Sequence, residues 1–274
     1  MRVMNAPVTT PMVSAATPPQ RRRSWILLLL AIALGAAMAL HGPIPQWASY
    51  HHFADRRMWL GIPNAADVLS NLPFALIGAW WLWAMREVPR TPATPAWRAF
   101  AVALIATAAG SAFYHWAPDN ASLAFDRLPI AWACAALTCA FLSERVDERW
   151  SHGGMLTAAL ALASVSVALW WWSETAGRSD LRAYLFVQFL PMLLVPAALL
   201  LRLPRCFAAA APDRAWWGVL LGYALAKGLE VADHAIFAHL QGLSGHTLKH
   251  LAAASAALWL LHGAHGAGRA VQLR

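Results

Sequence analysis

Long apolar segments dominate this chain and limit it to folds that a lipid bilayer accepts. Of its 274 residues, 59% are hydrophobic and 12% are charged, which is about half the charged fraction of a soluble domain. A helix needs about 20 apolar residues to cross a bilayer, and barrel strands need a polar-apolar alternation that is absent here. The sequence therefore predicts an all-α integral membrane protein. We expect eight spans, at 24–40, 66–85, 97–116, 123–142, 154–172, 181–201, 215–235 and 246–264.

One membrane domain with short tails accounts for the whole length. We expect residues 1–23 to be a disordered cytoplasmic tail, 24–40 an N-terminal anchor helix, 50–265 a seven-helix domain and 266–274 a second cytoplasmic tail. The three arginines of 21–23, the apolar run and an A-x-A sequence at 37–39 also resemble a cleavable signal peptide. We favour a retained anchor, because the run of about 17 residues is long for a signal sequence. Cleavage would leave seven helices in the same orientation.

The basic residues are distributed unequally between the two predicted sides of the membrane. Fourteen arginines lie in the tails and in the loops on the same side as the tails, and four lie on the opposite side. By the positive-inside rule both termini face the cytoplasm. The net charge of +8 is spread over short loops without a basic patch that interleaves aromatic residues, so it does not indicate nucleic-acid binding.

Polar residues inside the apolar segments point to a site near the outer face. His115 ends a helix that is predicted to run outward, and Ser111 lies one turn before it. Asp126 begins the next helix, and His246 and His250 begin the last one. All five residues are therefore expected at a similar depth. Polar groups are costly in hydrocarbon, so such a group of residues indicates a functional site.

The five residue types suit metal-assisted hydrolysis. His246 and His250 are one helical turn apart and share a face, and with His115 they supply the three nitrogen ligands of a catalytic zinc site. Asp126 is a candidate general base and acid, and Ser111 a candidate hydrogen-bond donor to a developing oxyanion. Other interpretations remain for single members: Asp126 pairs with Arg127 or caps its helix, and Ser111 bonds to a helix carbonyl.

A second polar group lies on the seventh segment. It consists of Lys227, Glu230, Asp233 and His234, and spacings of three and four place Lys227, Glu230 and His234 on one face. We interpret Lys227 and Glu230 as a buried ion pair that holds helices together. The alternative is a proton path, or an outer shell that orients a zinc-binding histidine. We expect Lys249 to point away from the histidine face and to pair with Asp233.

The sequence resembles the CREST superfamily of membrane hydrolases, and within it the alkaline ceramidase branch in a bacterial form. The resemblance covers about residues 50–265, and 24–40 is an additional leading helix. The spacing of four from Ser111 to His115 and of eleven from His115 to Asp126 matches the ceramidase pattern. The matching stretches are Asp67–Phe74, Gly110–His115, Asp126–Pro129 and Gly245–His250.

The resemblance implies a zinc-dependent amidase that cuts the N-acyl bond of ceramide-like lipids into a fatty acid and a long-chain amine. It implies zinc on His115, His246 and His250, assistance by Ser111 and Asp126, and a lipid substrate that enters from the bilayer. The expected location is a bacterial inner membrane. Three alternatives remain: a receptor-like seven-helix protein similar to the progestin/adipoQ receptors, a lipid-remodelling esterase of the same superfamily, and a metal or proton transporter. No feature of the sequence indicates the oligomeric state.

Calcium is a weaker expectation from the same resemblance. Eukaryotic alkaline ceramidases hold calcium with an acidic cluster before the first helix of the seven-helix domain. The corresponding region here offers oxygen ligands from Asp55, Asn64 and Asp67, but it lacks the acidic run of the family. Two carboxylates are few and Arg56 and Arg57 lie close by, so we prefer a structural loop.

Overall fold

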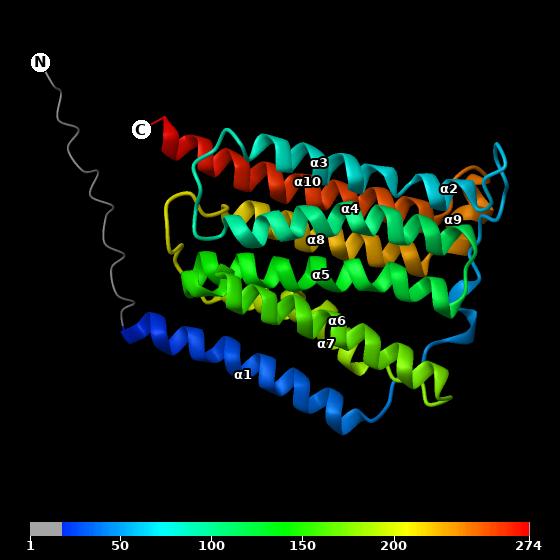
Figure 1. Ribbon diagram of the computed structural model, residues 1–274, viewed down its shortest axis with the longest axis horizontal. Coiled ribbons are helices and arrows are strands. Elements are labelled where there is room, and N and C mark those ends of the chain that lie inside the picture. Colours follow the sequence, from blue (N-terminus) through cyan, green and yellow to red (C-terminus); the bar gives the residue numbers. More distant parts are fainter. Residues whose placement is uncertain (1–17, 274) are drawn as a thin grey trace, which may run out of the picture.

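The computed structural model describes residues 18–273 and shows a bundle of long helices that lie roughly side by side (Figure 1). Within these residues the only extended pairing is an isolated bridge between Trp59 and Ile62. The predicted all-α class is therefore confirmed. The α-helices are α1 Pro18–His41, α2 Ala65–Leu69, α3 Leu72–Ala84, α4 Thr94–Trp116, α5 Asn120–Arg145, α6 Gly153–Thr175, α7 Arg182–Leu200, α8 Asp213–Val231, α9 Asp233–Leu240 and α10 Gly245–Gln272, and two 3₁₀-helices cover Ala48–His51 and Glu148–Ser151.

Six helical segments in the described part of the chain are long and apolar enough to cross a membrane. They are Arg23–His41, Ala65–Ala84, Thr94–Trp116, Asn120–Arg145, Gly153–Thr175 and Arg182–Leu200. The expected spans 215–235 and 246–264 correspond to α8 with the start of α9 and to α10, but these helices do not reach the same apolarity. They carry charged and histidine side chains, namely Lys227 and Glu230 on α8 and His246, Lys249 and His250 on α10. These six helices are compatible with the predicted membrane protein, and the count of eight spans stays a prediction.

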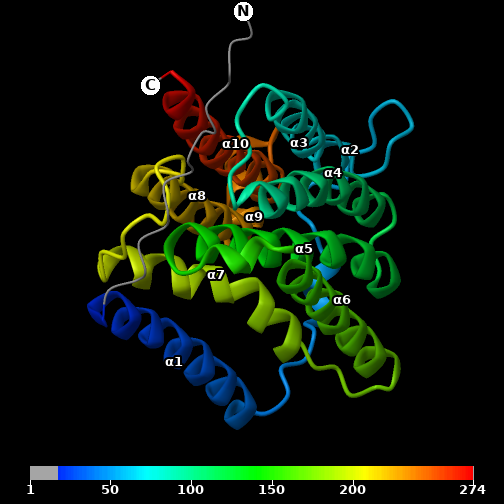
Figure 2. The ribbon, with the colours of Figure 1, turned by 60° about the vertical axis from the view of Figure 1, so that its left-hand side comes forward.

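The long helices alternate in direction, so that the predicted site residues gather at one end of the bundle. α4 ends where α5 and α10 begin, and the start of α1 and the end of α10 lie at the opposite end (Figure 1). Figure 2 shows α1 at one side of the bundle beside α7, with α3 and α10 at the other side. The bundle is thus an up-and-down arrangement, and we call the end that carries the predicted site residues its polar end.

One expectation about the tails needs correction, and the other stays a prediction. The predicted disordered tail 1–23 falls partly on residues 1–17, which lie outside the described residues, but α1 begins at Pro18, so 18–23 are helical. Proline suits the first turn of a helix because its missing N–H would have no partner there. The predicted tail 266–274 is helical through Gln272. Its Gly268 is buried against Val88, so this part of α10 still packs on the bundle.

Two predicted spans are each divided into two helices. The first divides between Leu69 and Leu72. Pro73 lies in the first turn of α3, and a proline ring clashes with the carbonyl four residues earlier, which here belongs to Leu69. The second divides at Ala232, between α8 and α9, without a proline at the break. Both breaks lie at the end of the bundle that carries the site, where they place polar side chains toward its interior.

Two groups of buried apolar side chains form the core. The larger group includes Trp81, Trp97, Phe141 and Trp216, whose rings contact one another between α3, α4, α5 and α8. The smaller group lies closer to the site and consists mainly of side chains from α4, α5, α6, α7 and the 42–64 segment; its bulky members include Phe53, Tyr114, Leu123, Trp170 and Tyr184. The second group surrounds polar side chains that are described below.

Candidate metal centre

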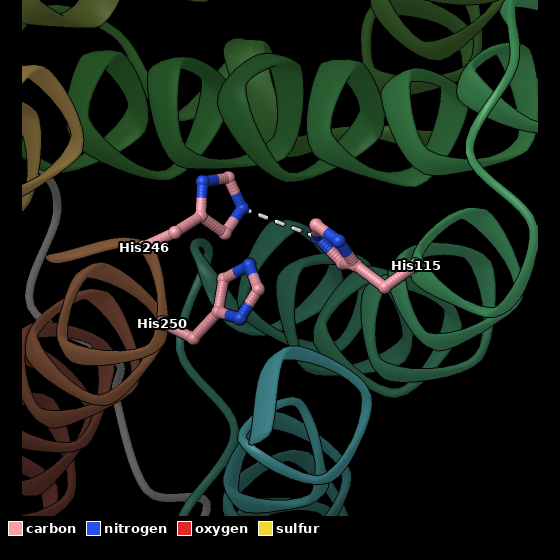
Figure 3. A group of neighbouring side chains, drawn as sticks. All are labelled: His115, His246 and His250. Atoms are coloured by element: carbon pink, nitrogen blue, oxygen red, sulfur yellow. Dashed lines mark hydrogen bonds between the residues drawn. The ribbon is translucent and has the colours of Figure 1, made fainter. Parts of the chain in front are cut away.

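Three histidines converge at the polar end of the bundle. His115 comes from the last turn of α4, and His246 and His250 come from the first turns of α10 (Figure 3). All three are buried, and one ring nitrogen from each lies within 4.8 Å of the others. The Nε2 atoms of His115 and His246 are 3.2 Å apart. The predicted convergence of these three side chains is therefore confirmed, and together they could hold a metal ion.

The start of α10 is fixed by polar contacts. The Ser244 hydroxyl accepts a hydrogen bond from the backbone N–H of Thr247 at 3.0 Å, which is an N-cap. Asp233 Oδ1 accepts from the backbone N–H of His246 at 2.7 Å, and Asp233 Oδ2 accepts from that of Ala54 at 2.9 Å. The bonds from Thr247 and His246 satisfy N–H groups that a helix leaves without partners at its start, and the bond from Ala54 joins a separate segment to the same carboxylate. They hold His246 in position before any ligand binds.

The end of α4 is fixed by a side chain from the segment before α2. The Asn64 amide donates to the backbone carbonyl of His115 at 2.7 Å. Asn64 itself adopts a left-handed conformation with φ of 45°, which asparagine tolerates better than most residues. A carbonyl at the end of a helix has no partner within the helix, so this bond both caps α4 and positions the backbone of His115.

The hydrogen bonds of His250 select its tautomer. The Ser70 hydroxyl donates to the carbonyl of Asp67 at 3.0 Å and lies 2.8 Å from Nδ1 of His250. A hydroxyl has a single proton to donate. The carbonyl of Asp67 can only accept, so we infer that Ser70 gives its proton to Asp67 and that Nδ1 of His250 donates to Ser70. The lone pair is then on Nε2 of His250, which is free to bind a metal.

One separation between the histidine nitrogens matches that of a zinc site. Zinc binds histidine nitrogens at about 2.0–2.1 Å in a tetrahedron, whose ligand atoms are about 3.3–3.4 Å apart. The separation of 3.2 Å between Nε2 of His115 and Nε2 of His246 is close to that edge. Nδ1 of His115 is buried without a hydrogen-bond partner, so this ring has few competing contacts. Imidazole also suits copper, iron and nickel, so the ligand set is consistent with zinc without being specific for it.

The two predicted catalytic side chains lie together beside this centre. Ser111 and Asp126 are both buried, and the Ser111 hydroxyl lies beside the Asp126 carboxyl. Oδ1 of Asp126 has no hydrogen-bond partner. Both residues line a cavity of about 390 Å³ that His250 also lines. This volume is in the range of small-molecule sites. Asp119, and not Asp126, caps α5: it accepts from the backbone N–H of Ser122.

The ion pair predicted between Lys227 and Glu230 on α8 is confirmed. The partner predicted for Lys249 was wrong. Glu230 accepts from Lys227, and also from Lys249 at 3.1 Å. Lys249 was expected to point away from the histidines toward Asp233, but its Nζ lies 3.0 Å from Nε2 of His246. Residues three apart on a helix share a face, as residues four apart do. A metal on Nε2 of His246 uses the same lone pair, so metal binding leaves Lys249 paired with Glu230 alone.

The residues considered for calcium have separate partners. Both carboxylate oxygens of Asp55 accept from Arg57, at 2.8 Å and 2.6 Å, and this contact lowers the pKa of Asp55. The amide nitrogen of Asn64 donates to the carbonyl of His115, as described above. Oδ1 of Asp67 accepts from Thr247 at 2.6 Å, while its Oδ2 has no partner. These contacts support the structural-loop interpretation of the region and give the calcium expectation no support.

Sequence reasoning did not identify several side chains that shape the centre. The ring of Phe53 packs against those of His115 and His246, with centroids 4.6 Å and 4.5 Å apart. No pattern in the sequence marks Phe53, because it lies in an irregular segment. Ser70 lies inside the stretch Asp67–Phe74 that matches the ceramidase pattern, so the signal for it was available, but no role was assigned to it.

The comparisons with known proteins leave the family undecided. No protein-family model matches this chain, and no curated protein matches it.

Proposed function

We propose that this protein is an integral membrane zinc amidase, which hydrolyses the N-acyl bond of ceramide-like lipids to a fatty acid and a long-chain amine. The observation that carries the proposal is the convergence of His115, His246 and His250 next to a paired Ser111 and Asp126. The resemblance to alkaline ceramidases assigns the same roles to the same five residues. A metal centre with one position open to a reactant is the arrangement of catalytic zinc sites.

The side chains around the centre have the properties that amide hydrolysis requires. Zinc, when bound, polarises the amide carbonyl and makes water a stronger acid. Asp126 has a carboxylate oxygen without a partner, so it is available to take a proton from the attacking water. As the carbon–oxygen bond forms and the carbon–nitrogen bond breaks, that proton passes to the leaving amine. When a substrate carbonyl enters, the Ser111 hydroxyl would turn from Asp126 and donate its hydrogen bond to the carbonyl oxygen, on which negative charge develops.

The cavity is suited to a lipid. Its lining is mostly apolar away from the polar end and includes Phe100, Leu104, Leu137 and Val219 from α4, α5 and α8. Acyl chains would lie along these side chains, with the amide at Ser111 and Asp126. The proposal includes eight spans, both termini in the cytoplasm of a bacterium and the site near the outer face of the inner membrane. The excess of arginine on the side of the tails supports that orientation.

The test combines zinc content and lipid-amide hydrolysis on one detergent-purified sample. The double variant His246→Ala/His250→Ala should lose both the metal and the release of fatty acid from ceramide. The matched control is His262→Ala on the same helix, which is exposed and distant from the cluster. It should keep about one zinc per chain and full turnover.

The other outcomes discriminate the alternatives. If the protein binds zinc but hydrolyses none of a broad panel of N-acyl lipids, the amidase proposal is wrong and a receptor-like role is favoured. Cleavage of lipid esters with amides left intact would make the protein an esterase. A wild-type protein that binds no zinc would overturn the proposed centre.

A further inference from the structure

Arg127 is a buried cation enclosed by aromatic rings. It follows Asp126 on α5, and only 4% of its surface is exposed. Its guanidinium carbon lies 4.0 Å from the ring centroid of Trp170, 5.0 Å from that of Tyr184 and 5.5 Å from that of Tyr50. Such cation–π contacts stabilise the charge in part. They also fix the plane of the guanidinium between α5, α6, α7 and the segment that follows α1.

The hydrogen-bonding capacity of Arg127 is largely unused. Its Nη2 donates to the side-chain oxygen of Gln46, and its Nη1 is buried without a partner. Among the described residues, no carboxylate forms an ion pair with it. A buried charge is normally paired, because removing it from water costs several kcal/mol. Arg127 therefore lacks the anion that its position calls for.

The other buried arginine of the same helix shows the contrast. Arg145, at the opposite end of α5, is also only 4% exposed. It forms an ion pair with Asp213 at 2.8 Å and donates to the carbonyl of Ala211 at 2.9 Å. The protein thus supplies a counter-ion for Arg145 from its own chain. For Arg127, the described residues supply no such counter-ion.

The free side of Arg127 belongs to the cavity of the candidate site. Arg127, Gln46 and Tyr50 line the same cavity as Ser111 and Asp126. Arg127 lies in the second turn of α5, at the end of the bundle that carries the site. Tyrosine and tryptophan side chains surround it, and such residues are typical of the depth at which lipid polar groups lie.

We propose that Arg127 is an anion subsite, which binds an oxyanion carried by a lipid in this cavity. A planar guanidinium presents paired N–H groups that match the oxygens of a carboxylate or a phosphate. The apolar remainder of the cavity selects a lipid over a free anion. Two sources supply this chemistry: the head group of an anionic lipid, and the carboxylate of a fatty acid. Only the second has a link to the proposed function, since amide hydrolysis would release such an acid beside Asp126.

The test is equilibrium binding to purified full-length protein in an uncharged detergent, with ligands that contain no amide. Oleate is compared with oleyl alcohol, and dioleoyl phosphatidylglycerol with dioleoyl phosphatidylcholine. We expect the anionic member of at least one pair to bind about tenfold or more tightly than its neutral partner. Preference for oleate identifies a carboxylate ligand, and preference for phosphatidylglycerol identifies a head group. Equal binding within both pairs would overturn the proposal.

Variants test whether Arg127 causes the preference for the anionic ligand. Arg127→Gln should remove the preference, and Arg127→Lys, which keeps the charge but not the paired donors, should retain part of it. The matched control is Arg178→Gln, because Arg178 is exposed and lies over Trp172 at the same end of the bundle. It should bind as the wild type does. A preference that survives Arg127→Gln would place the anion elsewhere.

The proposal stays testable if Arg127→Gln fails to fold. Thermal unfolding of the wild type alone should shift upward with the anionic ligand and not with its neutral partner, since a ligand that binds the folded state stabilises it. No shift with either anion would contradict the subsite. Because no step requires turnover, loss of the amidase proposal would leave this result unaffected, and the reverse also holds.

Discussion

Asp233 joins two segments of the site through one carboxylate: it accepts the backbone N–H of His246 at 2.7 Å and the backbone N–H of Ala54 at 2.9 Å. It lies in the first turn of α9, after the break that ends α8. Its role is to hold the backbone from which one metal ligand extends, and not to touch the metal. The expected outer-shell role of Asp233 thus acts through the main chain.

Replacement of Asp233 should therefore weaken metal binding without removing a ligand. We expect Asp233→Ala to lower zinc affinity roughly 10–100-fold, the usual effect of losing an outer-shell partner. Asp233→Asn keeps one acceptor oxygen and should have an intermediate effect. Competition with a chromophoric chelator measures the affinity. Asp147→Ala, which removes a carboxylate at the opposite end of the bundle, is the control, and equal affinities for all variants would contradict this role.

Ser70 should matter for the metal more than for the fold. It accepts from Nδ1 of His250 and so fixes the tautomer that presents Nε2. We expect Ser70→Ala to reduce zinc affinity by roughly tenfold or more, with a much smaller effect on thermal unfolding of the metal-free protein. Ser166→Ala is a matched control, since Ser166 is also a buried helix serine but donates only to a carbonyl of α6. If the two variants bind zinc equally well, the tautomer argument is wrong.

Gly110 lets α4 and α5 approach closely beside the site. A Cβ at this position would overlap the backbone carbonyl of Phe125 and come within 3.3 Å of Pro129. Backbone atoms cannot move aside as a flexible side chain can, so we expect Gly110→Ala to destabilise the protein by roughly 1–3 kcal/mol. Gly228→Ala, at a helix position with open space around it, should be neutral or slightly stabilising. Unfolding in detergent compares the two, and similar effects would contradict the close approach.

The sequence predicted the helices well because their apolar runs are long and their ends are marked. Every expected span corresponds to a helix or to two consecutive helices. The three histidines and the pair Ser111 and Asp126 were predicted together because alternating helix directions bring certain helix ends to one face. That argument needs only the order of the spans, which the apolar pattern supplies.

Contacts between irregular segments and helices could not be predicted from the sequence. Phe53 and Gln46 act from the segment between α1 and α2, whose path depends on the packing of the whole bundle. The partner of Lys249 was missed for another reason. Residues three apart and four apart both share a helix face, so the sequence alone does not show which way Lys249 points. Its direction depends on Glu230 on the neighbouring helix α8. The apolar pattern likewise could not show that Arg127 lacks an anion.

Lys249 places a positive charge next to a metal ligand. Its Nζ lies 3.0 Å from Nε2 of His246 and 3.1 Å from Glu230. A nearby ammonium repels a divalent cation, so we expect Lys249→Met to raise zinc affinity by about tenfold, which corresponds to about 1.4 kcal/mol. Lys227→Met is the control, because Lys227 pairs with Glu230 without contacting a histidine. Weaker binding by Lys249→Met would instead make this lysine a support for His246.

Acid should weaken the contact between the loop at Asp55 and the segment that joins α9 to α10. Arg57 lowers the pKa of the Asp55 carboxyl through their hydrogen bonds, and Arg57 also donates to the carbonyls of Gln241 and Gly242. A carboxyl with a lowered folded-state pKa contributes stability that is complete above its unfolded pKa, about 3.9, and is lost as the pH falls through the folded value. We therefore expect the unfolding temperature of the wild type to exceed that of Asp55→Asn by a constant amount between about pH 5 and 7. The difference should shrink below about pH 4, and a difference that is absent at pH 7 would show that the pair contributes nothing.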